Sequence, residues 1–88
     1  MNIFFEASFA RDLKQIKDKQ LQRRISQVID EIKAANGPND IKQLEKLKGY
    51  DNFYRIRISD YRMGIEIVAD KFIITRILQR KEIYRFFP

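Results

Sequence analysis

The chain of 88 residues contains no cysteine and no histidine. Without cysteine there is no disulfide, no thiolate chemistry and no zinc–thiolate site, and without histidine a structural or catalytic zinc site is not expected. Any acid–base chemistry must also proceed without imidazole, the side chain that enzymes use most often for this task. We therefore expect no metal and no small-molecule cofactor.

Long apolar runs are also missing from the sequence. No stretch approaches the roughly twenty apolar residues of a membrane span, and the first residues do not resemble a signal peptide. We therefore expect a cytoplasmic protein that does not enter a membrane. A chain of this length has room for one hydrophobic core, so residues 1–88 are expected to form a single domain.

Positive charge is present in excess. The chain carries 18 Lys and Arg against 12 Asp and Glu, a net charge of +6, and more of the excess lies in its second half. A basic surface attracts nucleic acid or an acidic protein, and the sign of the charge does not choose between them. A surface that only keeps the protein soluble is a further explanation.

Hydrophobic periodicity predicts helices in the first part of the chain. A short aromatic strand over residues 2–6 is followed by two helical patterns, over 9–16 and 21–32. Ser8 is expected to cap the first helix, and Gly37 to end the second in a left-handed conformation. Residues 39–49 fit either one or two further turns of helix or a loop anchored by apolar side chains.

Three alternating segments follow, at residues 53–58, 61–69 and 72–80, separated by short polar connectors. Such an arrangement predicts an antiparallel meander. Arg80 is expected to end the last strand, before a short terminal segment. The predicted fold is α+β, with an N-terminal strand and a helical hairpin packed on one face of a twisted antiparallel sheet.

Arginine dominates one face of the segment 53–58, where Arg55 and Arg57 alternate with isoleucines. Guanidinium groups are permanently charged hydrogen-bond donors that suit phosphate. Like charges two positions apart on one face repel unless an anion or an acid lies between them. If this segment pairs with 61–69, Arg57 should lie near Arg62, and Arg55 near Glu66 one step further along the face.

Structural roles are alternatives for several of these residues. Arg62 and Glu66 could form a cross-strand ion pair, and Arg76 is expected to be solvated or paired. Tyr54 and Tyr61 are more typical of core or cross-strand aromatics than of catalysts. Basic residues of the helical region are expected to form its solvated face, namely Arg11, Lys14, Lys17, Lys19, Arg23 and Arg24.

Four motifs occur in order along the second half of the chain: Leu47-Lys48-Gly49, Tyr54-Arg55-Ile56-Arg57, Asp60-Tyr61-Arg62 and Arg80-Lys81-Glu82-Ile83-Tyr84-Arg85. This ordered set resembles the RelE/ParE superfamily of toxins from bacterial and archaeal toxin–antitoxin pairs, over essentially the whole chain. The resemblance implies the RelE-type fold, similar to that of small microbial ribonucleases, and a cognate antitoxin protein as partner.

The two branches of this superfamily differ in activity. The RelE branch cuts messenger RNA in the ribosomal A site, whereas the ParE branch inhibits DNA gyrase without nuclease activity. RelE-type nucleases carry an arginine near the end of the last strand and a tyrosine soon after, and Arg80 and Tyr84 hold these positions. The resemblance thus implies a ribosome-dependent, metal-independent mRNA endoribonuclease that blocks translation. A gyrase inhibitor and an inactive homologue are the alternatives, and Gln79 stands where relatives often have histidine.

The same resemblance implies the residues of the site. Cleavage by 2′-hydroxyl attack would leave a 2′,3′-cyclic or 3′-phosphate and a 5′-hydroxyl, with arginines stabilising the charge on phosphorus. Tyr84 is the first choice of base, with Glu82 or Glu66 as fallbacks. The implied catalytic residues are Arg55, Arg57, Arg62, Arg80 and Tyr84, and the implied RNA-binding residues are Lys48, Lys81 and Arg85.

Overall fold

The computed structural model describes residues 2–88. Over this range the chain forms one five-stranded sheet with strand order β1-β5-β4-β3-β2. The elements are β1 (Asn2–Phe5), α1 (Ala7–Lys14), α2 (Lys19–Ala34), a 3₁₀ turn (Pro38–Asp40), β2 (Leu44–Lys46), β3 (Phe53–Ile58), β4 (Tyr61–Val68), β5 (Lys71–Gln79) and α3 (Arg80–Phe86).

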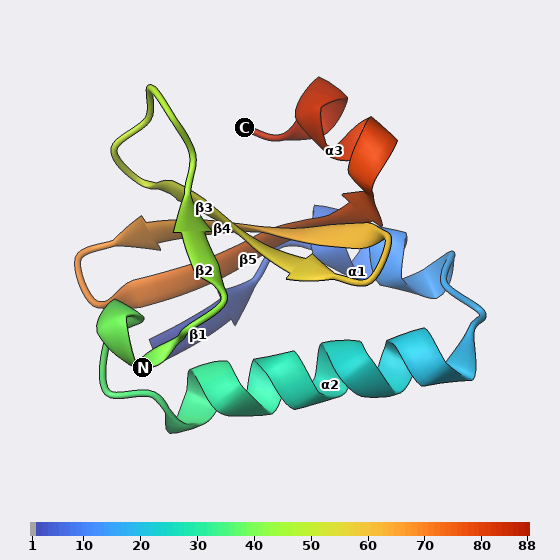
Figure 1. Ribbon diagram of the computed structural model, residues 1–88, viewed down its shortest axis with the longest axis horizontal. Coiled ribbons are helices and arrows are strands. Elements are labelled where there is room, and N and C mark those ends of the chain that lie inside the picture. Colours follow the sequence, from blue (N-terminus) through green and yellow to red (C-terminus); the bar gives the residue numbers. More distant parts are fainter. Residues whose placement is uncertain (1) are drawn as a thin grey trace.

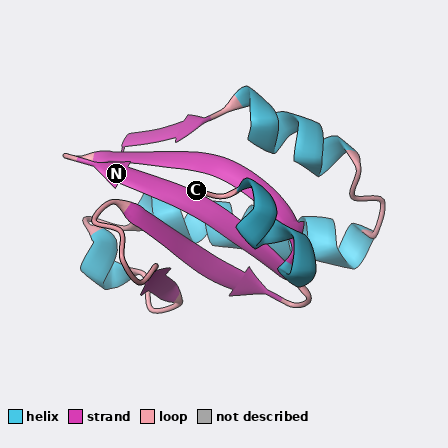
Figure 2. Cartoon of the chain, turned by 90° about the horizontal axis from the view of Figure 1, so that it is seen from above, coloured by secondary structure: helices cyan, strands magenta, loops and turns pink. Residues whose placement is uncertain are grey.

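The sheet separates two layers of helix. The long helix α2 runs along one face and the short helix α3 lies on the opposite face, while α1 packs against β5 (Figures 1 and 2). The predicted α+β class is confirmed, with one difference in the sheet. β1 pairs with β5 in parallel, so the sheet is mixed rather than purely antiparallel. No helix within residues 2–88 is long and apolar enough to cross a membrane.

The main core lies between α2 and the sheet. One stripe of α2 is buried at helical spacing, and alternate residues of β3, β4 and β5 meet it from the sheet. A second, smaller cluster lies on the other face of the sheet, where Leu47, Ile83 and Phe87 are buried against Phe53 and Leu78. The second cluster attaches α3 to the sheet.

Both predicted helix caps were wrong. α1 starts at Ala7, and Ser8 lies within its first turn, donating its hydroxyl to the Thr75 carbonyl at 2.6 Å. Because the helix begins one residue before Ser8, this hydroxyl is not at the capping position and binds a tertiary partner instead. α2 ends at Ala34, and Gly37 is extended, with φ of −170°. Because residues before proline favour extended backbone, Pro38 explains this conformation.

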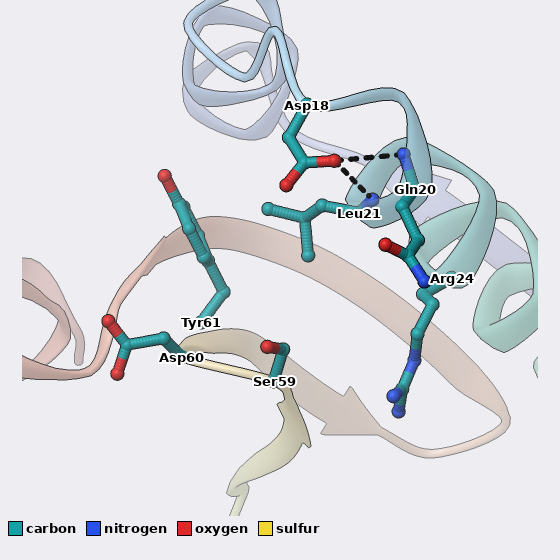
Figure 3. Close-up of a pocket in the computed structure, with 7 residues that line it drawn as sticks. All are labelled: Asp18, Gln20, Leu21, Arg24, Ser59, Asp60 and Tyr61. Atoms are coloured by element: carbon teal, nitrogen blue, oxygen red, sulfur yellow. Dashed lines mark hydrogen bonds between the residues drawn. The ribbon is translucent and has the colours of Figure 1, made fainter.

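Asp18 caps α2, and its Oδ1 accepts hydrogen bonds from the backbone N–H groups of Gln20 at 2.9 Å and Leu21 at 3.2 Å (Figure 3). These N–H groups have no partner within the helix, so the cap stabilises its first turn. Replacing Asp18 with alanine should lower the free energy of unfolding by about 1 kcal/mol, as measured by urea denaturation. The matched variant Asp30→Ala, at an exposed position within α2, should change it by less than about 0.5 kcal/mol. Equal losses in the two variants would contradict the capping role.

Residues 39–49 contain a strand that the sequence did not reveal. After the 3₁₀ turn, β2 pairs antiparallel with the edge of β3 and places Glu45 opposite Arg55. A strand of three residues is too short to show an alternating pattern. The apolar anchors are partly as predicted, because Ile41 and Leu47 are buried while Leu44 is half-buried.

The end of the last strand also differs from the prediction. β5 stops at Gln79, and Arg80 is the first residue of α3 rather than the last of the strand. The Arg80 N–H donates to the Asp60 carbonyl at 2.9 Å, which ties the start of α3 to the turn between β3 and β4. This junction brings the C-terminal helix to the arginine-bearing end of the sheet.

Candidate functional site

Four arginines gather on the face of the sheet that carries α3. Phe53 belongs to the cluster beneath α3, so the period of two puts Arg55 and Arg57 on the same face. Arg57 lies directly opposite Arg62 of β4, which confirms the predicted proximity of these two residues. Arg80 joins them from the start of α3.

Arg62 is the buried member of this group, with 8% of its surface exposed. Its Nη1 donates to the carbonyls of Ser59 at 3.0 Å and Tyr61 at 2.8 Å. These bonds fix the guanidinium beneath the surface.

The four guanidinium groups are close enough to act on one another. Burial lowers the pKa of Arg62 below its ordinary value, and the positive charges of Arg57, Arg80 and Arg55 lower it further, against an opposing effect of Asp60. Concentrated positive charge of this kind is relieved when an anion binds. The arrangement is therefore suited to a phosphate group. We call Arg55, Arg57, Arg62 and Arg80 the arginine cluster.

The register corrects one prediction about this face. Arg55 lies opposite Gly64, and Glu66 lies opposite Phe53, two pairs further along the ladder. Arg62 instead donates to backbone carbonyls, so it is not the ion-pair partner of Glu66.

Glu45 is a functional candidate that the sequence analysis missed. Its Oε1 lies 2.9 Å from Nε of Arg57 and 3.6 Å from Nε of Arg55. The longer distance is a charge contact only, because Nε of Arg55 is buried and has no hydrogen-bond partner among residues 2–88. The repulsion between the two arginines had indicated that an anion or an acid should lie between them, but the strand that supplies Glu45 was not predicted.

Tyr84 lies beside the arginine cluster on α3. It is 53% exposed, and the guanidinium carbon of Arg55 is 5.7 Å from the centre of its ring. Arg80, Lys81 and Tyr84 line one cavity of about 440 Å³ together with Asp60. Lys48 lines a neighbouring cavity with Arg55 and Tyr84.

The other predicted residues lie outside this arrangement. Arg85 is exposed on α3 and lines neither of the two cavities. Glu82 and Gln79 line a different cavity with Asp12. Arg76 forms a two-bond ion pair with Asp12, at 2.7 and 2.9 Å, which confirms a paired strand charge, and this hydrogen bonding raises the pKa of Arg76.

Comparison with known proteins gives the family of the chain. The family model for the ParE toxin of type II toxin–antitoxin systems matches residues 3–84. The chain is also 43% identical over 89 residues to the toxin RelE3 of Methanocaldococcus jannaschii, with all of both proteins covered. The chain belongs to the RelE/ParE superfamily of toxins.

Solved structures agree with this membership. The toxin is similar to a chain of the RelB–RelE antitoxin–toxin complex from Methanococcus jannaschii, with 42% identity, a TM-score of 0.80 and coverage of 97% and 99% of the two chains. The RelE–RelB complex from Pyrococcus horikoshii matches at 20% identity, a TM-score of 0.70 and coverage of 90% and 93%. The YoeB dimer from Staphylococcus aureus matches at 24% identity, a TM-score of 0.70 and coverage of 91% and 97%, and these two more distant matches show the shared fold.

The position of Tyr84 in the toxin depends on how α3 packs on the sheet. Ile83 is fully buried, and the Phe87 ring meets Phe53 edge-on with centroids 5.5 Å apart. The same ring lies against Gly64, where an added Cβ would be 2.8 Å from its nearest carbon. The absence of a side chain at Gly64 therefore allows the close approach of Phe87, the residue that follows α3.

Replacing Gly64 with alanine should displace Phe87 and lower the free energy of unfolding by about 1–3 kcal/mol, measured by thermal or urea denaturation. The double variant Gly64→Ala with Phe87→Leu should recover part of this loss, because a smaller side chain can move aside. Gly37→Ala is the matched control, since nothing lies within 4 Å of the added Cβ. A Gly64→Ala protein as stable as the Gly37→Ala protein would contradict this packing argument.

A separate cavity of about 280 Å³ lies between the start of α2 and the turn that joins β3 to β4 (Figure 3). Leu21 of α2 points toward Tyr61 across this cavity, but the carboxylate of Asp18 is already engaged in capping α2. Neither Tyr84 nor any member of the arginine cluster lines it. The arginine-bearing face is therefore the stronger candidate for the site. The residues that line this separate cavity are Asp18, Gln20, Leu21, Arg24, Ser59, Asp60 and Tyr61.

Proposed function

We propose that this toxin is a ribosome-dependent endoribonuclease that cuts messenger RNA in the A site and so blocks translation. The observation that carries the proposal is the convergence of the arginine cluster beside Tyr84 of α3, with Arg57 opposite Arg62 and the guanidinium of Arg55 5.7 Å from the centre of the Tyr84 ring. A row of guanidinium groups on a sheet offers fixed, charged donors to the phosphate of a bound RNA strand. The activity known for the RelE branch supports the same conclusion.

The arginines stabilise the charge that develops on phosphorus when the 2′-hydroxyl attacks. Arg62 is held by two carbonyls, so its charge is oriented before substrate arrives. Arg57, whose Nε contacts Glu45, and Arg80 are exposed and can donate to phosphate oxygens. The reaction breaks the bond to the 5′-oxygen and leaves a 2′,3′-cyclic phosphate, and a metal ion has no required part in it.

Two protons must move in this reaction. We assign the first to Glu45, whose carboxylate contacts the arginine cluster and can take the proton of the 2′-hydroxyl. We assign the second to Tyr84, whose phenol can give its proton to the departing 5′-oxygen while Arg55 stabilises the phenolate. Tyr84, the first choice of base in the sequence analysis, is thus the acid in this proposal, and the fallback bases Glu66 and Glu82 lie outside the cluster.

The ribosome is expected to supply what this small site lacks. The chain has no histidine, whose imidazole could act as general base and general acid, so cleavage of naked RNA should be slow. A ribosome that bends the messenger would align the 2′-hydroxyl with the scissile bond. This role places the toxin in the cytoplasm.

A cognate antitoxin is the second partner that we propose. The similar RelE protein was solved in complex with the antitoxin RelB, and a toxin of net charge +6 is electrostatically suited to an acidic partner. Binding over the arginine cluster would prevent RNA from reaching it.

Expression of the toxin followed by mapping of messenger 5′ ends tests the proposal. Cuts in phase with codons, carrying 5′-hydroxyl groups, are expected. Supercoiling defects or DNA breaks without such cuts would establish gyrase inhibition instead, the activity of the ParE branch. Absence of both effects would identify an inactive homologue.

A further inference from the structure

A cavity of about 430 Å³ adjoins the arginine cluster, between the loop that follows β2 and the end of α3. Arg55 and Tyr84 lie at its boundary with the arginine cluster, since both line the cavity. Its volume falls within the range of small-molecule sites. The cavity therefore continues the phosphate-binding face rather than forming a separate site.

The loop that follows β2 supplies side chains of two kinds to this cavity. Gly49 adopts a left-handed conformation, with φ of +83°, and Lys48 and Tyr50 flank this turn. Lys46 and Lys48 are exposed and line the cavity. The loop thus combines positive charge with an aromatic ring.

Tyr50 is anchored on one side and open on another. Its ring meets Phe53 edge-on, with centroids 5.7 Å apart, yet 47% of the residue is exposed. Phe53 in turn contacts Phe87, so Tyr50 rests on the same aromatic group that attaches α3 to the sheet. An aromatic side chain fixed in this way can receive a flat ligand without losing further side-chain freedom.

We propose that this cavity is a nucleobase subsite, which holds the base of a nucleotide next to the scissile phosphate and stacks it on Tyr50. Half-exposed aromatic rings beside lysine and arginine suit a nucleotide, because the base stacks on the ring while the charges bind its phosphate. An acidic peptide would match the lysines but has no use for the two half-exposed tyrosines. The proposal rests on the proposed RNA-cleaving function and extends it to recognition of the substrate base.

Binding of a short RNA to the purified toxin tests the subsite without requiring cleavage. The probe is a single-stranded hexanucleotide with 2′-O-methyl groups throughout, and its bases are removed one position at a time. Affinity is measured by calorimetry at fixed salt. For the unaltered toxin, one abasic position should weaken binding by roughly 5- to 100-fold, the range expected for one base–aromatic stack.

The variants then identify the ring responsible. Tyr50→Ala should weaken binding of the intact RNA by a similar factor and should no longer respond to that abasic position. Tyr50→Phe should behave as the unaltered toxin, because the ring is kept. Phe4→Ala is the matched control, since Phe4 is 48% exposed but lies on β1, at the opposite edge of the sheet.

Several results would overturn the subsite. One is an unaltered toxin that responds to no abasic position, and this measurement does not depend on how well any variant folds. Another is a Tyr50→Ala protein that keeps the full abasic response. A third is a Tyr50→Ala protein that binds the antitoxin more weakly but binds RNA as the unaltered toxin does, which would assign the cavity to the antitoxin. If Tyr50-dependent RNA binding is found but cells show no messenger cuts, the subsite stands and the proposed nuclease activity fails.

Discussion

Replacing Arg80 with alanine is expected to slow messenger cleavage on programmed ribosomes by about 10²–10³-fold, because one preorganised charge at the developing phosphorane is lost. Arg80 is exposed, and the contact that positions it is its backbone N–H bond to Asp60, which alanine retains. The thermal stability of the variant should therefore be close to that of the unaltered toxin. Single-turnover cleavage at saturating toxin measures the chemical step directly.

Arg23→Ala is the matched control for this experiment. It removes the same charge from an exposed position of α2, on the opposite side of the sheet from α3. Cleavage by this variant should change by no more than a few-fold, through the reduced net charge alone. If both variants slow cleavage equally, general electrostatic attraction explains the effect and the assignment of Arg80 is wrong.

The variant Glu45→Gln should reduce the cleavage rate by about 10²–10⁴-fold, the range for removal of a general base. The amide keeps the size of the side chain but cannot take a proton from the 2′-hydroxyl. Loss of this negative charge beside Arg55 and Arg57 should at the same time leave RNA binding unchanged or make it tighter. Slower cleavage with undiminished binding is the result that separates proton transfer from a structural role.

Glu31→Gln provides the comparison, because Glu31 is exposed on α2 and far along the chain from the cluster. Its cleavage rate should equal that of the unaltered toxin. A Glu45→Gln toxin that cuts at more than about a tenth of the normal rate would show that another group takes the proton. Tyr84 and Asp60, which line one cavity with Arg80, would then be the remaining candidates at this face.

Much of the fold follows from hydrophobic alternation. The strand 53–58 was predicted with its observed bounds, and the pairing of Arg57 with Arg62 followed from the short connector after it. The helical pattern over 21–32 was equally clear, since Leu21, Ile25, Val28 and Ile32 are buried at helical spacing and Ile29 is half-buried. Long helices and strands can be predicted from sequence because their apolar residues recur at a fixed spacing along the whole segment.

The parts that were missed are short or depend on distant partners. β2 has three residues, and its effect on the site comes from Glu45, whose partners follow it by ten and twelve positions. Ser8 binds Thr75 from the other end of the chain, which no local pattern could show. The family resemblance indicated Arg80 and Tyr84, but the helix that positions them became visible only in the structure.

The pairing of β1 with β5 has a consequence for the synthesis of this toxin. Asn2 meets Lys71, so β1 is synthesised well before β5, the strand that becomes its neighbour in the sheet. Contacts so distant in sequence form late in folding. The arginine cluster also needs α3, which follows β5. The proposed RNA-cleaving face therefore cannot form before β5 and α3 have been synthesised and have folded onto the sheet, so the segment from β1 to β4 cannot carry it alone.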